Sequence, residues 1–217
     1  MAGETSPRET APAFPKAQEV LDFWFGPNAL AADELPQRLR LWFGSEDPPE
    51  VLEVRDEVIA QRFGALVETA ATGELDGWQA SPRRLLALIL LLDQFPRHIF
   101  RGKSRAFAQD ARAMAFSLDG LQTGADAALA PLERLFFYLP LQHAESRAVQ
   151  EESIAAYRRL ASDAPAGQRD LFDGCLRFAE QHYRIIERFG RFPHRNAALA
   201  RRNTPDELNY LHTGEGL

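Results

Sequence analysis

The chain has 217 residues, 45% of them hydrophobic and 26% charged, which is typical of one globular domain with a substantial core. Its formal net charge of −6 argues against a surface that binds nucleic acid or an anionic membrane. The single cysteine, Cys175, excludes an intramolecular disulfide and cysteine-rich zinc sites, and it fits a reducing cytoplasm. The longest apolar run, residues 85–92, is far shorter than the about 20 residues that span a bilayer. We therefore expect a soluble, cytoplasmic protein with no membrane and no nucleic-acid partner.

The N-terminal segment, residues 1–15, is rich in Ala, Pro, Thr and Glu. It has no apolar segment typical of a secretion signal, so we predict that it forms a disordered lead-in. Residues 16–217 are predicted to form a single helical domain. Strand signals are nearly absent there, because the valines and isoleucines never alternate with polar residues.

Proline and glycine mark the ends of the predicted helices, taken here in chain order. The segment EVLDFWF predicts a short helix that Gly26 and Pro27 end. The next helix is predicted to take Asp47 as its cap and Pro48 as its first residue, and to end at Gly73. Its apolar residues fall on one helical face: Leu52, Val54, Val58, Ile59, Phe63, Leu66, Val67 and Ala70.

The middle of the chain predicts three more helical segments. One begins at Pro82, and another runs from Ser104 to about Leu121. A third begins at Pro131 and is predicted to bend or break at Pro140, because an internal proline removes a backbone donor.

Two helices are predicted in the last part of the chain. A long one ends at Gly190. The segment TPDELNYL opens on a capping box, with Thr204 at the N-cap and Glu207 three residues later. The total is eight or nine helices, and the predicted fold class is all-α.

An acid follows the apolar run of the helix that begins at Pro82. Asp93 lies one helical turn after Ile89 and two turns after Leu86, on a side that is apolar throughout. An unpaired carboxylate in such surroundings would cost several kcal/mol. Asp93 therefore needs a cationic or hydrogen-bond-donating partner, and Arg97 is the nearest candidate in the sequence.

Two other helix ends show the same order of apolar helix, proline and polar cluster. In the first, His143 falls in line with Phe136 and Leu139 and is predicted to point inward, with Gln142 and Glu145 beside it. In the second, His182 is predicted to lie on a buried stripe with Phe178, Ile185, Ile186 and Phe189. The polar residues that follow are Arg191, His194, Arg195 and Asn196.

Polar side chains on apolar stripes are best explained if they meet. We therefore predict that Asp93, His143 and the arginines after Gly190 come within hydrogen-bond reach, directly or through water. Charge supports this prediction, because residues 184–202 hold six arginines and a single acid, Glu187.

Five blocks of the sequence, in order, resemble the signature blocks of the bacterial domain-of-unknown-function family 924. They are VLDFWFG, LLDQFPRHIFRG, PLQHAES, HYRIIERFGRFPHRN and TPDELNYL, and they span residues 20–211. The resemblance implies an all-helical, tetratricopeptide-like α-α superhelix. It implies no activity.

Two functions are open for the predicted polar cluster. In the first, the cluster is the pocket of a small-molecule enzyme or sensor, in which Asp93, His143 and Glu145 are the catalytic candidates. The candidates for binding an anionic substrate are Gln94, Arg97, Gln142, His182, Arg191, His194, Arg195 and Asn196. In the second, the cluster is a structural salt-bridge network in a module that binds a protein or peptide.

No metal site and no cofactor is predicted. The sequence has no His-Glu-x-x-His, no Gly-x-Gly-x-x-Gly and no Walker loop. A homodimer is a further option, because the apolar segments FFYL and VLDFWF suit a dimer interface as well as a core.

Overall fold

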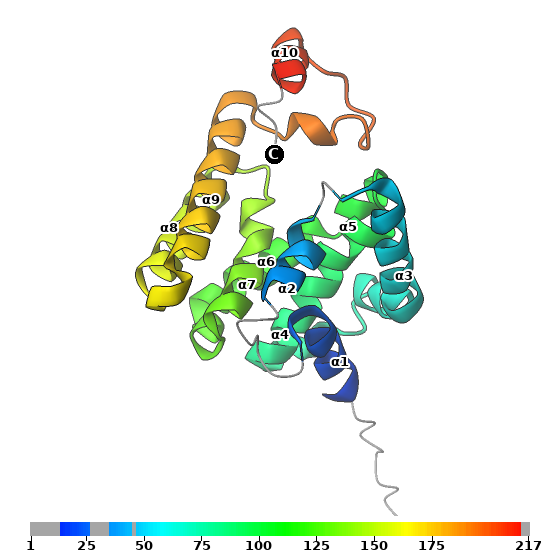
Figure 1. Ribbon diagram of the computed structural model, residues 1–217, viewed down its shortest axis with the longest axis vertical. Coiled ribbons are helices and arrows are strands. Elements are labelled where there is room, and N and C mark those ends of the chain that lie inside the picture. Colours follow the sequence, from blue (N-terminus) through cyan, green and yellow to red (C-terminus); the bar gives the residue numbers. More distant parts are fainter. Residues whose placement is uncertain (1–13, 27–34, 45–46, 214–217) are drawn as a thin grey trace, which may run out of the picture.

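The computed structural model describes residues 14–26, 35–44 and 47–213, and within them the chain is helical with no strand (Figure 1). A π-helical turn, Leu90–Gln94, joins α4 to α5 without a break. Counted this way, the described residues hold nine helices, within the predicted number. The α-helical segments are α1 (Phe14–Phe25), α2 (Leu35–Phe43), α3 (Pro49–Ala71), α4 (Pro82–Ile89), α5 (Phe95–Ile99), α6 (Asp110–Thr123), α7 (Pro131–Gln142), α8 (Arg147–Ser162), α9 (Arg169–Phe189) and α10 (Pro205–Thr213).

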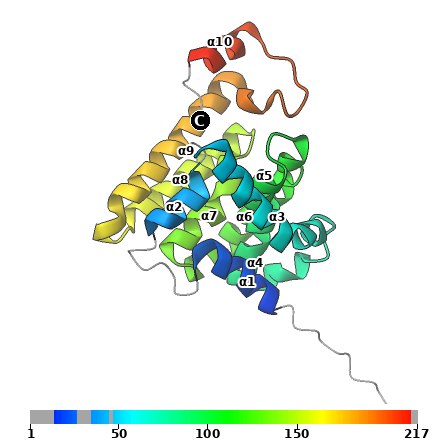
Figure 2. The same cartoon turned by 45° about the vertical axis from the view of Figure 1, so that its right-hand side comes forward.

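The continuous helix from α4 to α5 is the centre of the core. Every residue from Leu85 to Leu92 is buried, and α1, α3, α6 and α7 pack around this helix. A helical segment that is apolar on every side is buried completely, because neighbouring helices pack against each of its sides. Next to this centre, α7 packs on α8 and α8 on α9, and the last two lie side by side in both views (Figures 1 and 2).

Most of the predicted helix ends are confirmed. Pro82 and Pro131 begin α4 and α7. Gly190 ends α9 with a φ of 69°, a conformation that glycine adopts without steric strain. The capping box at the start of α10 is formed in both directions: Glu207 N–H donates to Thr204 Oγ1 at 3.2 Å, and Thr204 N–H donates to Glu207 Oε2 at 2.7 Å.

Some predicted helix boundaries are wrong. Helix α3 begins at Pro49 with Pro48 before it, and Asp47 pairs with Arg55 at 3.1 Å and does not cap the helix. The helix predicted from Ser104 is a short 3-10 turn there, and α6 begins only at Asp110. The break predicted at Pro140 is confirmed to within two residues, because α7 ends at Gln142 and α8 follows as a separate helix.

The predicted start of the domain also shifts slightly. Helix α1 begins at Phe14, so the predicted boundary at residue 15 falls inside it. Residues 1–13, with their predicted disorder, and Pro27 lie outside the described residues.

Two of the predicted buried faces are too wide. On α3, Val54 and Val58 are 64% and 41% exposed, because the buried stripe is the narrower set Ile59, Phe63, Val67 and Ala70. On α9, Phe178 is 55% exposed although it shares a helical side with His182. A 3.6-residue period identifies the side of a helix that faces the core, but it does not tell how far along the helix a neighbour covers that side.

No described helix is both long and apolar enough to cross a membrane. Cys175 is half-buried and free, and burial raises the pKa of its thiol to about 12. A thiol with such a pKa is unreactive at neutral pH, as expected for a structural cysteine.

We expect Gly120→Ala to lower the free energy of unfolding by about 1–3 kcal/mol. A Cβ at this position in α6 would overlap Cζ of Phe137 and would lie 3.1 Å from Cδ2 of Leu85. Gly64→Ala in α3 is the matched control, because a Cβ there meets no atom within 4 Å, and it should stabilise the helix by up to about 1 kcal/mol. Urea denaturation measures both, and equal effects would contradict the close packing of α6.

Candidate functional site

The π-helical turn places the first predicted site residue. Asp93 lies in this turn with no exposed surface, and the apolar run before it holds the turn in the core. A π-turn adds one residue to the helix and turns the following side chains relative to the preceding ones. Asp93 therefore points toward the end of α7, and the adjacent Gln94 and the Arg97 of the next turn contact it.

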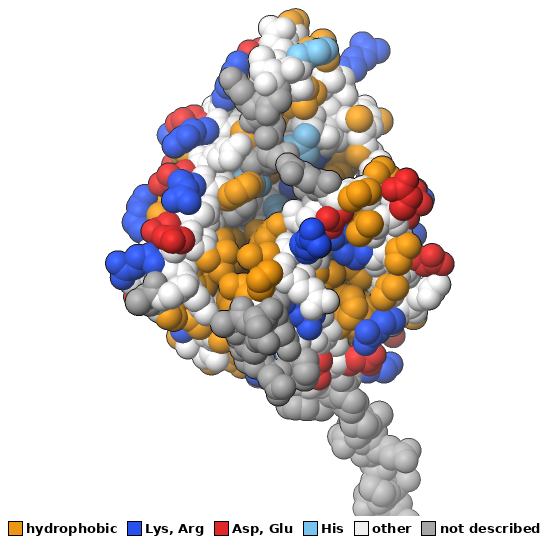
Figure 3. Space-filling model, viewed as in Figure 1, with side chains coloured by type: hydrophobic (Ala, Val, Ile, Leu, Met, Phe, Trp, Pro, Cys, Tyr) orange, Lys and Arg blue, Asp and Glu red, His pale blue; other side chains and the backbone are white. Residues whose placement is uncertain are grey.

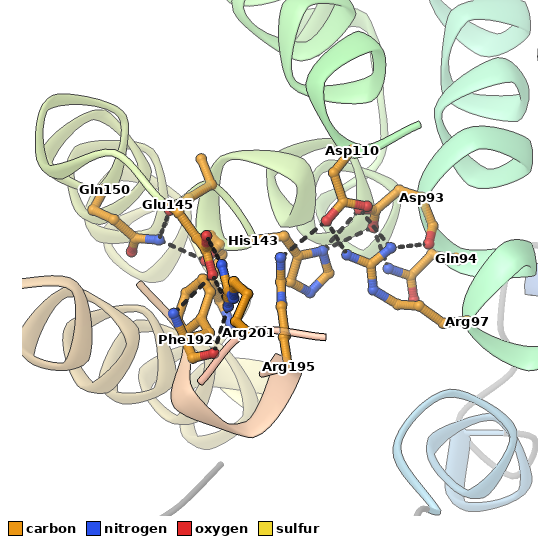
Figure 4. Close-up of polar contacts among 12 residues, drawn as sticks. Asp93, Gln94, Arg97, Asp110, His143, Glu145, Gln150, Phe192, Arg195 and Arg201 are labelled. Carbon is orange, nitrogen blue, oxygen red and sulfur yellow. Dashed lines mark hydrogen bonds and ion pairs between the residues drawn. The ribbon is translucent and has the colours of Figure 1, made fainter. Parts of the chain in front are cut away.

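The predicted contact between Asp93 and His143 is present (Figure 4). His143 follows the last residue of α7, and its Nδ1 lies 2.8 Å from Asp93 Oδ1 and 3.0 Å from Oδ2. Arg97 Nη1 lies 3.1 Å from Asp93 Oδ1, and the Gln94 amide donates to Oδ2. The carboxylate is thus satisfied by three neighbours, as a buried charge requires.

A second carboxylate, that of Asp110, joins these residues to the C-terminal part of the chain. Asp110 Oδ2 lies 3.1 Å from Arg97 Nη2 and 3.1 Å from Arg195 Nη1. Arg195 is buried between the rings of Phe107 and Phe192, with its guanidinium carbon 4.8 and 4.6 Å from their centroids. We name the set Asp93, Gln94, Arg97, Asp110, His143 and Arg195 the central cluster.

The protonation states in the central cluster follow from burial and charge. Burial would raise the pKa of Asp93, but the charge of Arg97 and the hydrogen bonds from His143 and Gln94 outweigh burial and hold this pKa well below its usual range. Burial and the charge of Arg97 lower the pKa of His143. His143 is therefore neutral at pH 7. A carboxylate can only accept, so the proton lies on Nδ1 and Nε2 carries a lone pair.

The other two charged groups shift in opposite directions. Burial and the nearby charge of Asp93 raise the pKa of Asp110, so of the two carboxylates Asp110 takes up a proton first. Burial and the charge of Arg97 lower the pKa of Arg195 to about 10, which leaves it charged at neutral pH. With two acids and two arginines, the central cluster is close to neutral.

Two buried polar atoms of the central cluster have no hydrogen-bond partner among the described residues. Asp110 Oδ1 and Arg195 Nε are buried without one. His143 Nε2 makes no such bond either, and 14% of the His143 side chain is exposed. Buried polar groups in a purely structural network are as a rule satisfied, so these atoms are exceptions to that rule.

Glu145, predicted as a catalytic partner of His143, lies outside the central cluster. Its carboxylate accepts the N–H of Phe192 at 2.8 Å and pairs with Arg201 at 2.6 and 2.9 Å (Figure 4). Asn196 is buried beside it and accepts from Arg201 Nε at 2.8 Å. These contacts tie the segment after α9 to the start of α8 and so hold Arg195 in place.

The remaining predicted residues lie around the central cluster and do not join it. Gln142 and His182 are buried against each other, and His182 Nδ1 donates to the carbonyl of Phe178 at 2.8 Å. Arg191 points away from the central cluster and pairs with Glu207 at 2.6 Å. Glu207 belongs to the capping box of α10, so this pair stabilises the start of that helix. His194 is exposed, with its ring 5.5 Å from that of Phe192.

Two features of the surface border this region. In the space-filling view a hollow lies between α9 and α2, with hydrophobic side chains across its middle and histidine side chains above them (Figure 3). A cavity of about 110 Å³ borders Gln94 and Arg97 on the side of α2 and α3. This volume is smaller than the about 300 Å³ of a typical small-molecule pocket, so it suits a molecule of only a few atoms.

Sequence reasoning missed Asp110 and Arg201. A signal for Asp110 exists: the six arginines of residues 184–202 need acids from elsewhere in the chain, and Asp110 opens a helix shortly after Arg97. It was not identifiable by spacing, because Asp110 and Arg195 are 85 residues apart.

Together these features define an all-α, single-domain protein with a buried ion-pair network. The chain belongs to the family described as bacterial protein of unknown function (DUF924), which matches residues 20–215 and confirms the predicted family. A solved structure, of the protein of unknown function ATU0120 from Agrobacterium tumefaciens, is similar to this chain, with 38% identity and a TM-score of 0.74. The alignment covers 92% of this chain and 98% of that one. A search of curated proteins finds no match.

Asp110→Asn should lower the free energy of unfolding by about 2–4 kcal/mol, because it leaves the buried guanidinium of Arg195 and the half-buried one of Arg97 without their shared carboxylate. Asp206→Asn removes an acid from an exposed pair with Arg188, whose atoms are 2.6 Å apart, and should change stability by less than about 1 kcal/mol. Chemical denaturation of both variants gives the comparison. Similar values for the two would mean that Asp110 does not bridge the cluster.

Stability should fall between pH 7 and pH 5. Burial lowers the pKa values of His98, His143 and His182, that of His182 to about 3, so the unfolded chain binds more protons than the folded one below about pH 6.5. Each group adds a slope of up to about 1.4 kcal/mol per pH unit. His182→Gln should make the pH dependence shallower, and the same change at exposed His212 should not. Identical slopes in the wild type and His182→Gln would refute this account.

Proposed function

We propose that this chain binds and chemically changes a small anionic molecule at the central cluster, with His143 as the proton-accepting group. The single observation that carries the proposal is the state of the His143 ring. Its Nδ1 is fixed against both oxygens of Asp93, at 2.8 and 3.0 Å, while Nε2 makes no bond with a described residue. A histidine oriented in this way, and neutral at pH 7, is suited to general-base catalysis.

Each neighbour has a separate role in this proposal. His143 Nε2 accepts a proton from a hydroxyl group or a water molecule, and the resulting imidazolium is stabilised by Asp93, which acts as a positioning residue. Arg195, with Nε unpartnered among the described residues, binds the anionic part of the molecule. Asp110 keeps Arg97 and Arg195 in place.

The alternative is a structural network inside an interaction module. One observation favours it: both arginines of the central cluster already have carboxylate partners, so the site holds no excess of positive charge. In that case the tetratricopeptide-like superhelix predicted from the family resemblance would present the hollow beside α9 to a peptide. A cytoplasmic location belongs to both readings.

A thermal-shift screen of small carboxylates distinguishes the two. The proteins are the wild type, His143→Gln and, as the matched control, His212→Gln, which changes an exposed histidine of α10. A ligand at about 100 times its Kd stabilises the protein by about 2.7 kcal/mol, which raises the melting temperature by several degrees. We expect this shift in the wild type and in His212→Gln and its loss in His143→Gln.

One further variant, Asp93→Asn, is needed to recognise the result that would contradict the proposal. Asp93→Asn removes the charge that orients His143. If no ligand shifts the wild type and Asp93→Asn is merely unstable, the network is structural and the proposal is wrong.

A further inference from the structure

The small cavity beside the central cluster has an unusual lining. Its walls come from α2, α3 and the helix that continues from α4 into α5. The described lining residues include three arginines and no acid. They are Trp42, Gly44, Arg55, Gln94, Arg97, His98 and Arg101. A concave site lined by guanidiniums concentrates positive potential and favours an anion.

One helix supplies most of this lining. Gln94 and His98 lie four residues apart on one face of the helix, and Arg101 lies in the turn just after α5. Arg55 comes from α3 on the opposite wall. The sequence DQFPRHIFRG thus serves two sites, because Asp93 faces the end of α7 while the residues after it face the cavity.

The acids that balance these arginines do not line the cavity. Arg101 pairs with Asp56 through Nε and Nη2, at 2.6 and 2.9 Å. Arg55 pairs with Asp47 at 3.1 Å. The guanidiniums line the cavity and their acids do not, which favours an anion in it.

Some donors and acceptors of the lining residues are not used by the described residues. Arg55 Nε is buried with no hydrogen-bond partner among the described residues, and Arg101 Nη1 bonds to none of them either. His98 donates from Nδ1 to Asp56 at 2.9 Å, so its Nε2 carries a lone pair. Gln94 turns its NH₂ toward Asp93, which leaves its carbonyl oxygen as an acceptor.

We propose that this cavity binds a phosphate group. Its volume of about 110 Å³ suits an oxyanion of about five heavy atoms, since a cavity of about 150 Å³ holds a benzene molecule. The arginines would bind the phosphate oxygens, and His98 and Gln94 would accept the hydrogen bond of a P–OH group. Sulfate has no such hydrogen at neutral pH and should bind more weakly. The cavity shares Gln94 and Arg97 with the central cluster, but phosphate binding there does not require proton transfer at His143.

Isothermal titration calorimetry with inorganic phosphate tests the site at constant ionic strength, with sulfate and chloride as comparison ions. The variant is Arg101→Gln, because Arg101 lines the cavity and 43% of its side chain is exposed. The matched control is Arg105→Gln, which removes an exposed arginine that pairs with Glu68 and does not line the cavity. We expect Arg101→Gln to weaken phosphate binding at least about tenfold and Arg105→Gln to leave it unchanged.

A second measurement uses the wild type alone, so its result does not depend on whether the variant folds. The ¹⁵N resonance of Arg55 Nε–H should shift when phosphate is added, and not when chloride is added. No phosphate binding in the wild type, or equal weakening by both variants, overturns the proposal. Sulfate binding as tight as phosphate overturns the role of His98 and Gln94. Phosphate binding that persists in His143→Gln separates this site from the proposed catalytic one.

Discussion

The burial of one carboxylate governs this structure. Asp93 follows directly on a helical run that is buried on every side, and it has no exposed surface. Without partners its charge would cost several kcal/mol, a large part of the stability of a domain of this size. Arg97 from the next turn and His143 from the end of α7 meet this requirement. Through Arg97 and Asp110 the same network reaches Arg195, so three distant segments of the chain are fixed at one point.

The same contacts serve both the stability of the fold and the chemistry of the cluster. The contacts that satisfy Asp93 also fix the tautomer and orientation of His143, which are the properties of a general base. A binding site differs from a purely structural network in the polar atoms that packing leaves without a hydrogen-bond partner. Asp110 Oδ1 and Arg195 Nε are such atoms among the described residues. Gln94 and Arg97 contact Asp93 and also line the cavity, so occupation of that cavity would be felt at Asp93.

The sequence predicted the contact between Asp93 and His143 because a polar group on an apolar helical face must be paired. It predicted most helix ends because proline and glycine act locally. Glu145 was placed near His143 by proximity in the sequence, but the turn before α8 directs it toward Arg201. Asp110 was missed because its partner Arg195 is close only after the whole chain has folded. Long-range pairs of this kind have no periodic signal.

The π-helical turn at Leu90–Gln94 also limits how sequences with this fold can vary in length. Surface loops accept insertions and deletions easily. One residue removed from this turn would rotate everything after it by about 100° relative to the apolar run before it. The acid would then leave the end of α7, and the arginines that follow would leave the cavity wall. The number of residues in the turn 90–94 is therefore fixed, whereas the loops between the helices can vary in length.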